Sequence, residues 1–82
     1  MTRFELGKHP YVDRDSCEFV LEYHEAANCW RIAAYYFKNN RAPLGYRYLF
    51  ELDNGQVSSN KNEDIYYTLY NSDVVQKLLL LL

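Results

Sequence analysis

Nine tyrosines in a chain of 82 residues constrain this protein more than any other feature of its sequence. A tyrosine side chain joins a large apolar ring to a hydroxyl that needs a hydrogen-bonding partner, so it is enriched in cores and at binding surfaces. A domain of this length buries only roughly 60% of the surface that its unfolded chain exposes. The chain therefore cannot bury all nine rings, and we expect several tyrosines on the surface.

Composition indicates one globular domain over residues 1–82. Apolar residues make up 49% of the chain and charged residues 24%, which is ordinary for a folded protein. The net charge of −2 argues against a strongly basic nucleic-acid binder and against a highly acidic mimic of DNA. Cys17 and Cys29 are too few for a disulfide scaffold, and residues 1–10 lack the apolar run of a secretory signal. We therefore expect a cytoplasmic protein with reduced thiols.

Apolar residues recur at spacings of three and four in the first half of the chain. This repeat is the pattern of one helix face, and it predicts a long helix that begins near Asp15 and ends before Pro43. Asp15, with Glu18 three residues later, would cap its start. The repeat consists of Val20, Tyr23, Ala27, Trp30, Ala34 and Phe37.

Residues 17–24 also fit a strand, which is the competing interpretation of this segment. Cys17, Phe19, Leu21 and Tyr23 alternate there with Glu18, Val20, Glu22 and His24. Because the three-four repeat continues well beyond residue 24, the helix is the favoured prediction.

The second half of the chain predicts strands. Residues 46–52 alternate and lead into Asp53, Asn54 and Gly55, which favour a type I′ hairpin turn that pairs Val57 with Leu52. Residues 65–70 alternate as another strand, and Asn71 or Ser72 would cap a short helix that carries the leucines. The expected fold is α+β: one long helix in the N-terminal half packed on a small antiparallel sheet of about three strands, with a short C-terminal helix.

Exposed tyrosines are the first candidate partner-binding residues. Side chains alternate between the two faces of a strand, so Tyr66 and Tyr70 would point outward if Ile65 and Leu69 pack inward. Two further tyrosines fall outside the apolar stripe of the expected helix, namely Tyr35 and Tyr36. We expect these four rings to bind another protein.

An acidic stripe is the second candidate surface. Asp15, Glu18, Glu22 and Glu25 follow one another at spacings of three, four and three, so they would share one face of the expected helix. This face would dock a basic partner surface, or it would be a solvated face whose first turns favour carboxylates through the helix dipole.

A nucleic-acid interface is the alternative function. Residues 26–50 contain no acid, and Arg31, Lys38, Arg41 and Arg47 are interleaved there with aromatic residues as far as Tyr48. Cations for phosphates and rings for base stacking are what a single-stranded nucleic-acid binder uses.

Chemical sites have less support in the sequence. Cys17, His24 and Cys29, with His9 upstream, match no compact zinc motif, and the three glycines are too isolated for a phosphate-binding loop. A small hydrolase or nuclease using His24, Arg31, Arg47 and a tyrosine ranks third. We therefore expect no enzyme, no metal and no cofactor.

Five consecutive leucines, Leu78–Leu82, are too few to cross a membrane, which takes about 20 apolar residues. They would point around almost the full circle of a helix, so they cannot all face one core. The alternatives are a frayed end and a homodimer or partner contact. The sequence thus favours a small intracellular protein-binding module that inhibits or modulates its partner, a size class that includes inhibitors encoded by mobile elements and phages.

Overall fold

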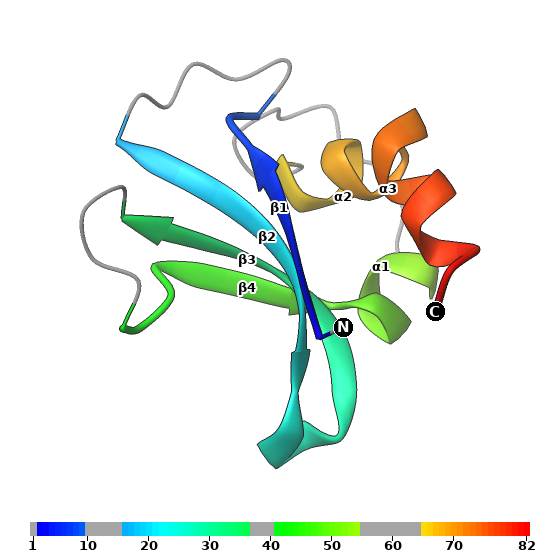
Figure 1. Cartoon of the computed structure of the whole chain (residues 1–82), viewed down its shortest axis with the longest axis horizontal. Coiled ribbons are helices and arrows are strands. Elements are labelled where there is room, and N and C mark those ends of the chain that lie inside the picture. The colour runs from blue at the N-terminus through cyan, green and yellow to red at the C-terminus, as the bar shows by residue number, and fades with distance from the viewer. Residues whose placement is uncertain (1, 10–15, 37–40, 55–64) are drawn as a thin grey trace.

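The computed structural model describes residues 2–9, 16–36, 41–54 and 65–82. Four strands form one antiparallel sheet in the order β1-β2-β3-β4, and three short helices gather on one side of it (Figure 1). The strands are β1 (Arg3–Gly7), β2 (Cys17–His24), β3 (Cys29–Tyr36) and β4 (Gly45–Tyr48), with the 3₁₀ turn η1 (Glu25–Ala27) between β2 and β3. The helices are α1 (Leu49–Asn54), α2 (Ile65–Tyr70) and α3 (Asp73–Leu79).

The prediction of a long helix is wrong, because residues 17–36 form the hairpin of β2 and β3. Phe19 lies opposite Ala34 and Leu21 lies opposite Ile32, so the alternating pattern and not the three-four repeat sets the structure. Asn28 ends the η1 turn with a φ of 53°, and its N–H donates to the carbonyl of Glu25. Asparagine tolerates this left-handed conformation better than most residues, which suits it to closing the hairpin.

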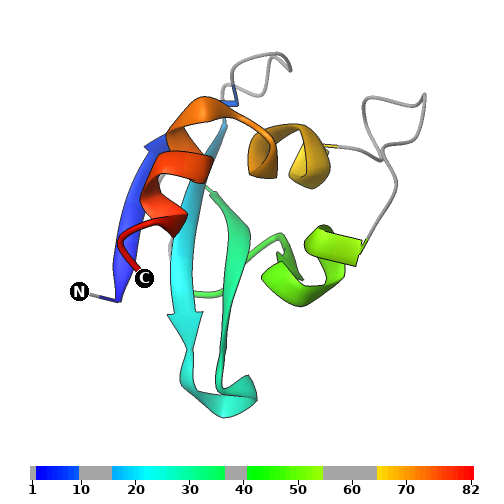
Figure 2. The ribbon, with the colours of Figure 1, turned by 90° about the vertical axis from the view of Figure 1, so that its right-hand side faces the viewer.

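One face of the sheet, here the helix face, carries the core. Phe19, Leu21 and Ile32 from the two central strands are at most 1% exposed, and the helices add Leu69 and Val75 to the same cluster. Figure 2 views the molecule from the helix face and shows the helices in front of the strands. Trp30 also lies on this face, half-buried, with its ring 5.9 Å from that of Phe4.

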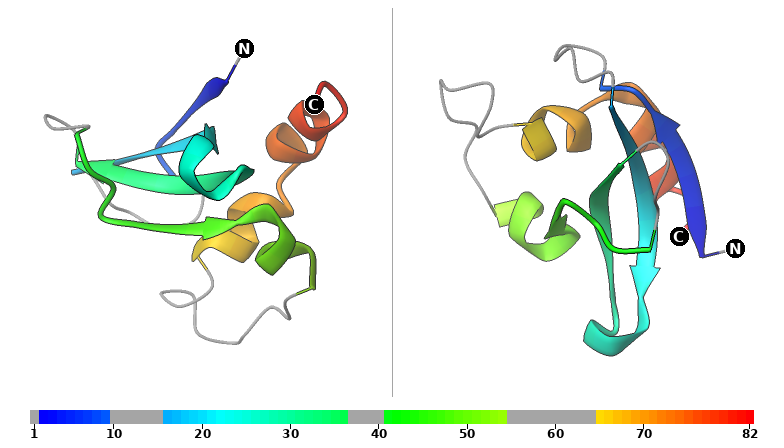
Figure 3. Two further views of the ribbon diagram at one scale, coloured as in Figure 1. Left: turned by 90° about the horizontal axis from the view of Figure 1, so that it is seen from below. Right: turned by 90° about the vertical axis from the view of Figure 1, so that its left-hand side faces the viewer.

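The opposite face, here the polar face, presents the alternate residues of the same strands. Charged and aromatic side chains predominate on it, although Val20 and Ala33 are buried there together with Tyr35. Figure 3, in its right panel, views the molecule with the strands in front of the helices. The register places the following residues on this face: Arg3, Glu5, Glu18, Val20, Glu22, His24, Cys29, Arg31, Ala33, Tyr35, Tyr46 and Tyr48.

Two of the expected strands need correction. The strand over residues 46–52 ends at Tyr48, and the next six residues are α1, of which Leu52 is buried. Residues 65–70 form α2 and not a strand, because Ile65, Tyr66 and Leu69 at helical spacing all reach the core. The expected turn at Gly55 and the pairing of Val57 lie outside the described residues.

The short C-terminal helix is present as α3. Ser72 caps it by accepting a hydrogen bond from the N–H of Val75, as its place in the sequence predicted. Leu78 and Leu79 pack against the core, whereas Leu80 is 84% exposed and Leu81 is 73% exposed. None of the helices in the described residues is long and apolar enough to cross a membrane.

Candidate functional site

A row of aromatic rings runs along β4 into α1. The ring of Tyr48 lies 5.3 Å from that of Tyr46 and 5.6 Å from that of Phe50, and it is stacked on Phe50 with an angle of 6° between the planes. His24, from the end of β2, stacks on Tyr48 from another side at 6.0 Å. We call Tyr46, Tyr48, Phe50 and His24 the aromatic ladder.

The aromatic ladder is accessible although its rings contact one another. Tyr46 is 39% exposed and Phe50 is 60% exposed, while Tyr48 and His24 are half-buried between them. β4 is an outer strand of the sheet, so the ladder lies along one margin of the polar face. Stacked neighbours restrict the rotamers of each ring, which reduces the conformational entropy that a partner would have to remove.

Hydrogen bonding fixes the centre of the ladder. His24 Nδ1 and the Tyr48 hydroxyl share a hydrogen bond of 2.9 Å. Desolvation, together with a hydrogen bond to Tyr46, raises the pKa of Tyr48 above its ordinary value of 10.0. The ladder therefore presents hydrogen-bonding phenol groups as well as apolar ring faces.

A buried ionic network lies next to the ladder on the polar face. Glu22 of β2 accepts from Arg31 Nε at 2.8 Å and from the Tyr35 hydroxyl at 2.6 Å. The side chains of Glu22 and Arg31 are only about one-tenth exposed. Such a pair is stable only when its remaining hydrogen-bonding positions are satisfied, as Tyr35 does here.

Arg31 connects this network to the ladder. Its guanidinium carbon lies 4.5 Å from the centroid of the Tyr46 ring, within the range of a cation–π contact. Burial alone would lower the pKa of Arg31, but its hydrogen bonds to Glu22 and Tyr35 raise it above the ordinary value. Desolvation and the hydrogen bond to Glu22 raise the pKa of Tyr35 as well. The network thus holds Arg31 fixed beneath Tyr46.

Arg3 of β1 extends the network to the far side of the sheet. Its guanidinium lies 3.6 Å from Glu22 and 5.3 Å from the centroid of the Tyr35 ring. Arg3 also pairs with Glu5 at 3.0 Å. Each of the two arginines of the polar face is therefore paired with a glutamate.

The tyrosines expected to bind a partner are separated by the fold. Tyr66 is 9% exposed, so its expected outward orientation is wrong: α2 turns it into the core. Tyr70 is half-buried, and its hydroxyl donates to Asp53 at 3.1 Å. Tyr35 is buried in the ionic network, while Tyr36 is 50% exposed on the opposite face of the same strand.

The acidic stripe does not form, because the helix that would carry it is absent. Glu18 and Glu22 lie on the polar face of β2, where Glu22 is buried, and Glu25 is exposed in η1. Asp15 lies outside the described residues.

The sequence placed Tyr46 and Tyr48 in the alternative nucleic-acid interface, among the aromatic residues of the segment 26–50, and it indicated no partner-binding role for Phe50. Their alternation was visible, but the sequence did not show which face of the strand would carry the helices. His24 was considered as a metal ligand and as a catalytic residue, and its position beside Tyr48 depends on a pairing of strands that the helical interpretation excluded.

The cysteines and the possible metal ligands among the described residues do not come together in one site. Cys17 and Cys29 are free thiols on opposite faces and at opposite ends of the hairpin. The described residues contain no group of three or more His, Cys, Asp and Glu side chains that could hold a metal ion. Arg47, proposed for a nuclease site, lies over the Tyr66 ring on the helix face, away from His24.

Comparisons with protein-family models, with curated proteins and with solved structures found no match for this chain.

Proposed function

We propose that this protein is a small protein-binding module that inhibits or modulates its partner, and that the aromatic ladder is its contact surface. The exposure of Tyr46 and Phe50 on a supported row of rings is the observation that carries the proposal. A contiguous apolar patch on a monomer surface marks a contact site for another molecule, whereas single exposed apolar side chains do not. Tyrosine and arginine are also the residue types most enriched among the residues that dominate binding energy.

The charges near the ladder favour a protein over a nucleic acid. Arg31 contacts the Tyr46 ring, and its charge is already neutralised by Glu22, whereas the guanidinium of Arg47 lies over the Tyr66 ring on the helix face. In the described strands, the polar face carries three glutamates, Glu5, Glu18 and Glu22, against two arginines. Phosphate binding needs uncompensated cations, so this surface offers rings for stacking without the charge that a nucleic acid requires.

The test is quantitative binding with a ladder variant and a matched control. A partner is first captured from host extract on the immobilised protein and then purified. Its affinity is measured for the wild type, for the double variant Tyr46→Ala with Phe50→Ala, and for Tyr36→Ala. Tyr36 is a suitable control because it is an exposed tyrosine that lies on the other face of the sheet.

We expect the ladder variant to lose at least roughly tenfold in affinity, which corresponds to about 1.4 kcal/mol, while Tyr36→Ala changes little. Urea unfolding of both variants is the control for stability, and affinities are compared under conditions in which all three proteins are fully folded. Equal affinity of the ladder variant and the wild type would refute the proposal. Salt-sensitive binding to single-stranded oligonucleotides, lost in the ladder variant, would replace it with the nucleic-acid function.

A further inference from the structure

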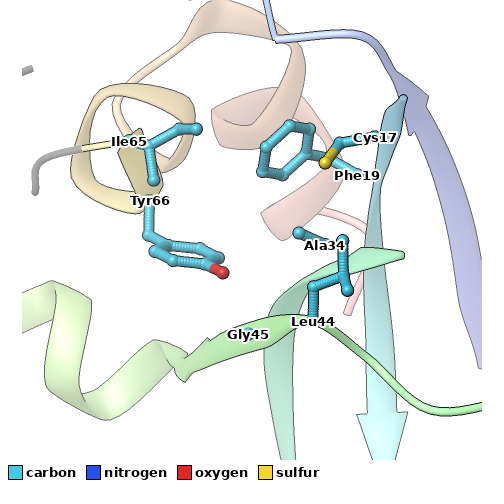
Figure 4. A pocket seen from close by; sticks show the side chains of 7 residues that line it. All are labelled: Cys17, Phe19, Ala34, Leu44, Gly45, Ile65 and Tyr66. Atoms are coloured by element: carbon cyan, nitrogen blue, oxygen red, sulfur yellow. The ribbon is translucent and has the colours of Figure 1, made fainter. Parts of the chain in front are cut away.

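A pocket on the helix face lies between the sheet and α2, away from the aromatic ladder. Its volume is about 220 Å³, and Figure 4 shows the side chains around it. Residues from β2, from β3, from the start of β4 and from α2 contribute to it, so it is formed only when the helix packs on the sheet. The lining residues are Cys17, Phe19, Ala34, Leu44, Gly45, Ile65 and Tyr66.

The size of the pocket matches a single ring with a small substituent. A dry cavity of about 150 Å³ in another protein binds benzene, and sites for drug-sized ligands begin at about 300 Å³. Leu44 at the rim is 60% exposed, so the pocket reaches the surface and a ligand can enter. Glycine at position 45 allows the Tyr66 hydroxyl to approach the strand at the edge of the pocket, since a Cβ there would lie only 2.6 Å from the hydroxyl oxygen.

The lining chemistry indicates a neutral aromatic ligand. None of the seven lining residues carries a formal charge, so an ion in the pocket would lose part of its hydration without a charged group in the lining to replace it. Phe19 and Tyr66 already meet edge to face at 6.3 Å, an arrangement that a third ring can extend. The Tyr66 hydroxyl points into the pocket (Figure 4), and a phenol has one donor and two acceptor positions, so it can bond a ligand besides its protein contacts.

We propose that this pocket binds a small neutral molecule that consists of one aromatic ring with a single hydrogen-bonding substituent. The site is independent of the aromatic ladder, because it lies on the opposite face of the sheet and uses none of the ladder residues.

Benzyl alcohol is the probe, and benzoate is its charged counterpart. Saturation-transfer NMR and the thermal unfolding midpoint measure binding of each to the full chain. Alkylation by N-ethylmaleimide gives a local readout, because Cys17 lines the pocket and Cys29 on the other face serves as an internal control. We expect saturable binding of benzyl alcohol, a rise in the unfolding midpoint, and several-fold slower alkylation of Cys17 but not of Cys29.

Two variants test the location. Ala34→Leu fills the pocket, and Leu44→Asp places a charge at its exposed rim, where folding tolerates substitution. Each should weaken benzyl alcohol at least roughly tenfold, whereas Tyr46→Ala on the polar face should leave it unchanged. If Ala34→Leu does not fold, Leu44→Asp and the Cys17 protection remain decisive.

Three results would overturn the inference. They are non-saturable binding of benzyl alcohol, equal protection of both cysteines, and tighter binding of benzoate than of the alcohol. The last would indicate an anion site served by Arg47, which lies 5.2 Å from the Tyr66 ring.

Discussion

Replacing Gly45 with alanine adds a single Cβ atom where Tyr66 of α2 packs on the sheet, and so tests that packing. A Cβ at this position would lie 2.6 Å from the Tyr66 hydroxyl oxygen, well inside the 3.4 Å of an ordinary contact. Tyr66 is 9% exposed and its ring is rigid, so the overlap can be relieved only by moving the ring or α2. Overpacking of this kind costs about 1–3 kcal/mol.

Tyr66→Phe removes the clashing atom and leaves the rest of the contact. The ring carbon that bears the hydroxyl is 3.7 Å from the added Cβ, which is an ordinary distance. In the Tyr66→Phe background, Gly45→Ala should therefore be neutral or stabilising by up to about 1 kcal/mol, because alanine loses less conformational entropy than glycine in a strand. The two substitutions should couple by about 1–3 kcal/mol.

Urea unfolding of the wild type, both single variants and the double variant, followed by Trp30 fluorescence, measures this coupling as a double-mutant cycle. Equal m-values across the four proteins are the control that the extent of unfolding is the same. Additivity within about 0.5 kcal/mol would show that Gly45 and Tyr66 do not meet, and the placement of α2 on β4 would then be wrong.

The ionic network gives two further predictions. Glu22→Gln should lower the free energy of unfolding by about 3 kcal/mol, because it leaves the buried Arg31 without its counter-charge. The control is Glu18→Gln on the same face, where Glu18 is half-buried, and it should cost less than about 1 kcal/mol. A loss below about 1 kcal/mol for Glu22→Gln in urea unfolding would contradict the network. The pKa of Tyr35 is raised in the folded state above its ordinary value of 10.0, so its contribution to stability is intact below that pH and falls as pH rises, because the unfolded chain loses the proton first. Tyr35→Phe should make the alkaline loss of stability shallower and Tyr36→Phe should not; identical slopes would show that burial and the hydrogen bond to Glu22 do not raise the pKa of Tyr35.

The sequence predicted β2 only as the weaker alternative, and it did not predict β3. A strand with one polar face is recognised by the alternation of apolar and polar residues. In β2, however, Val20 on the polar face is as buried as Phe19 on the helix face, so apolar residues occupy both odd and even positions. That arrangement imitates the three-four spacing of a helix. Asn28 was the physical clue, since it stands where a left-handed residue would end a turn.

The prediction of a strand over residues 65–70 was wrong for the opposite reason. An alternating pattern over only six residues fits both the repeat of a strand and the repeat of a helix. The burial of Ile65, Tyr66 and Leu69 follows the helical repeat. The expectation that some tyrosines are exposed is confirmed by Tyr36 and Tyr46. Which tyrosines are exposed could not be predicted, because that depends on the face to which the helices pack, a property of residues far apart in the chain.

The most direct test of the aromatic ladder as the contact surface is an NMR footprint. ¹⁵N-labelled protein is titrated with the purified partner, and backbone shift changes are mapped onto the described residues. The account predicts the largest changes over Tyr46–Phe50 and at His24 and Arg31, with little change in α2. Changes confined to α3 and Leu80–Leu82 would instead place the partner on the terminal leucines and would contradict the central claim.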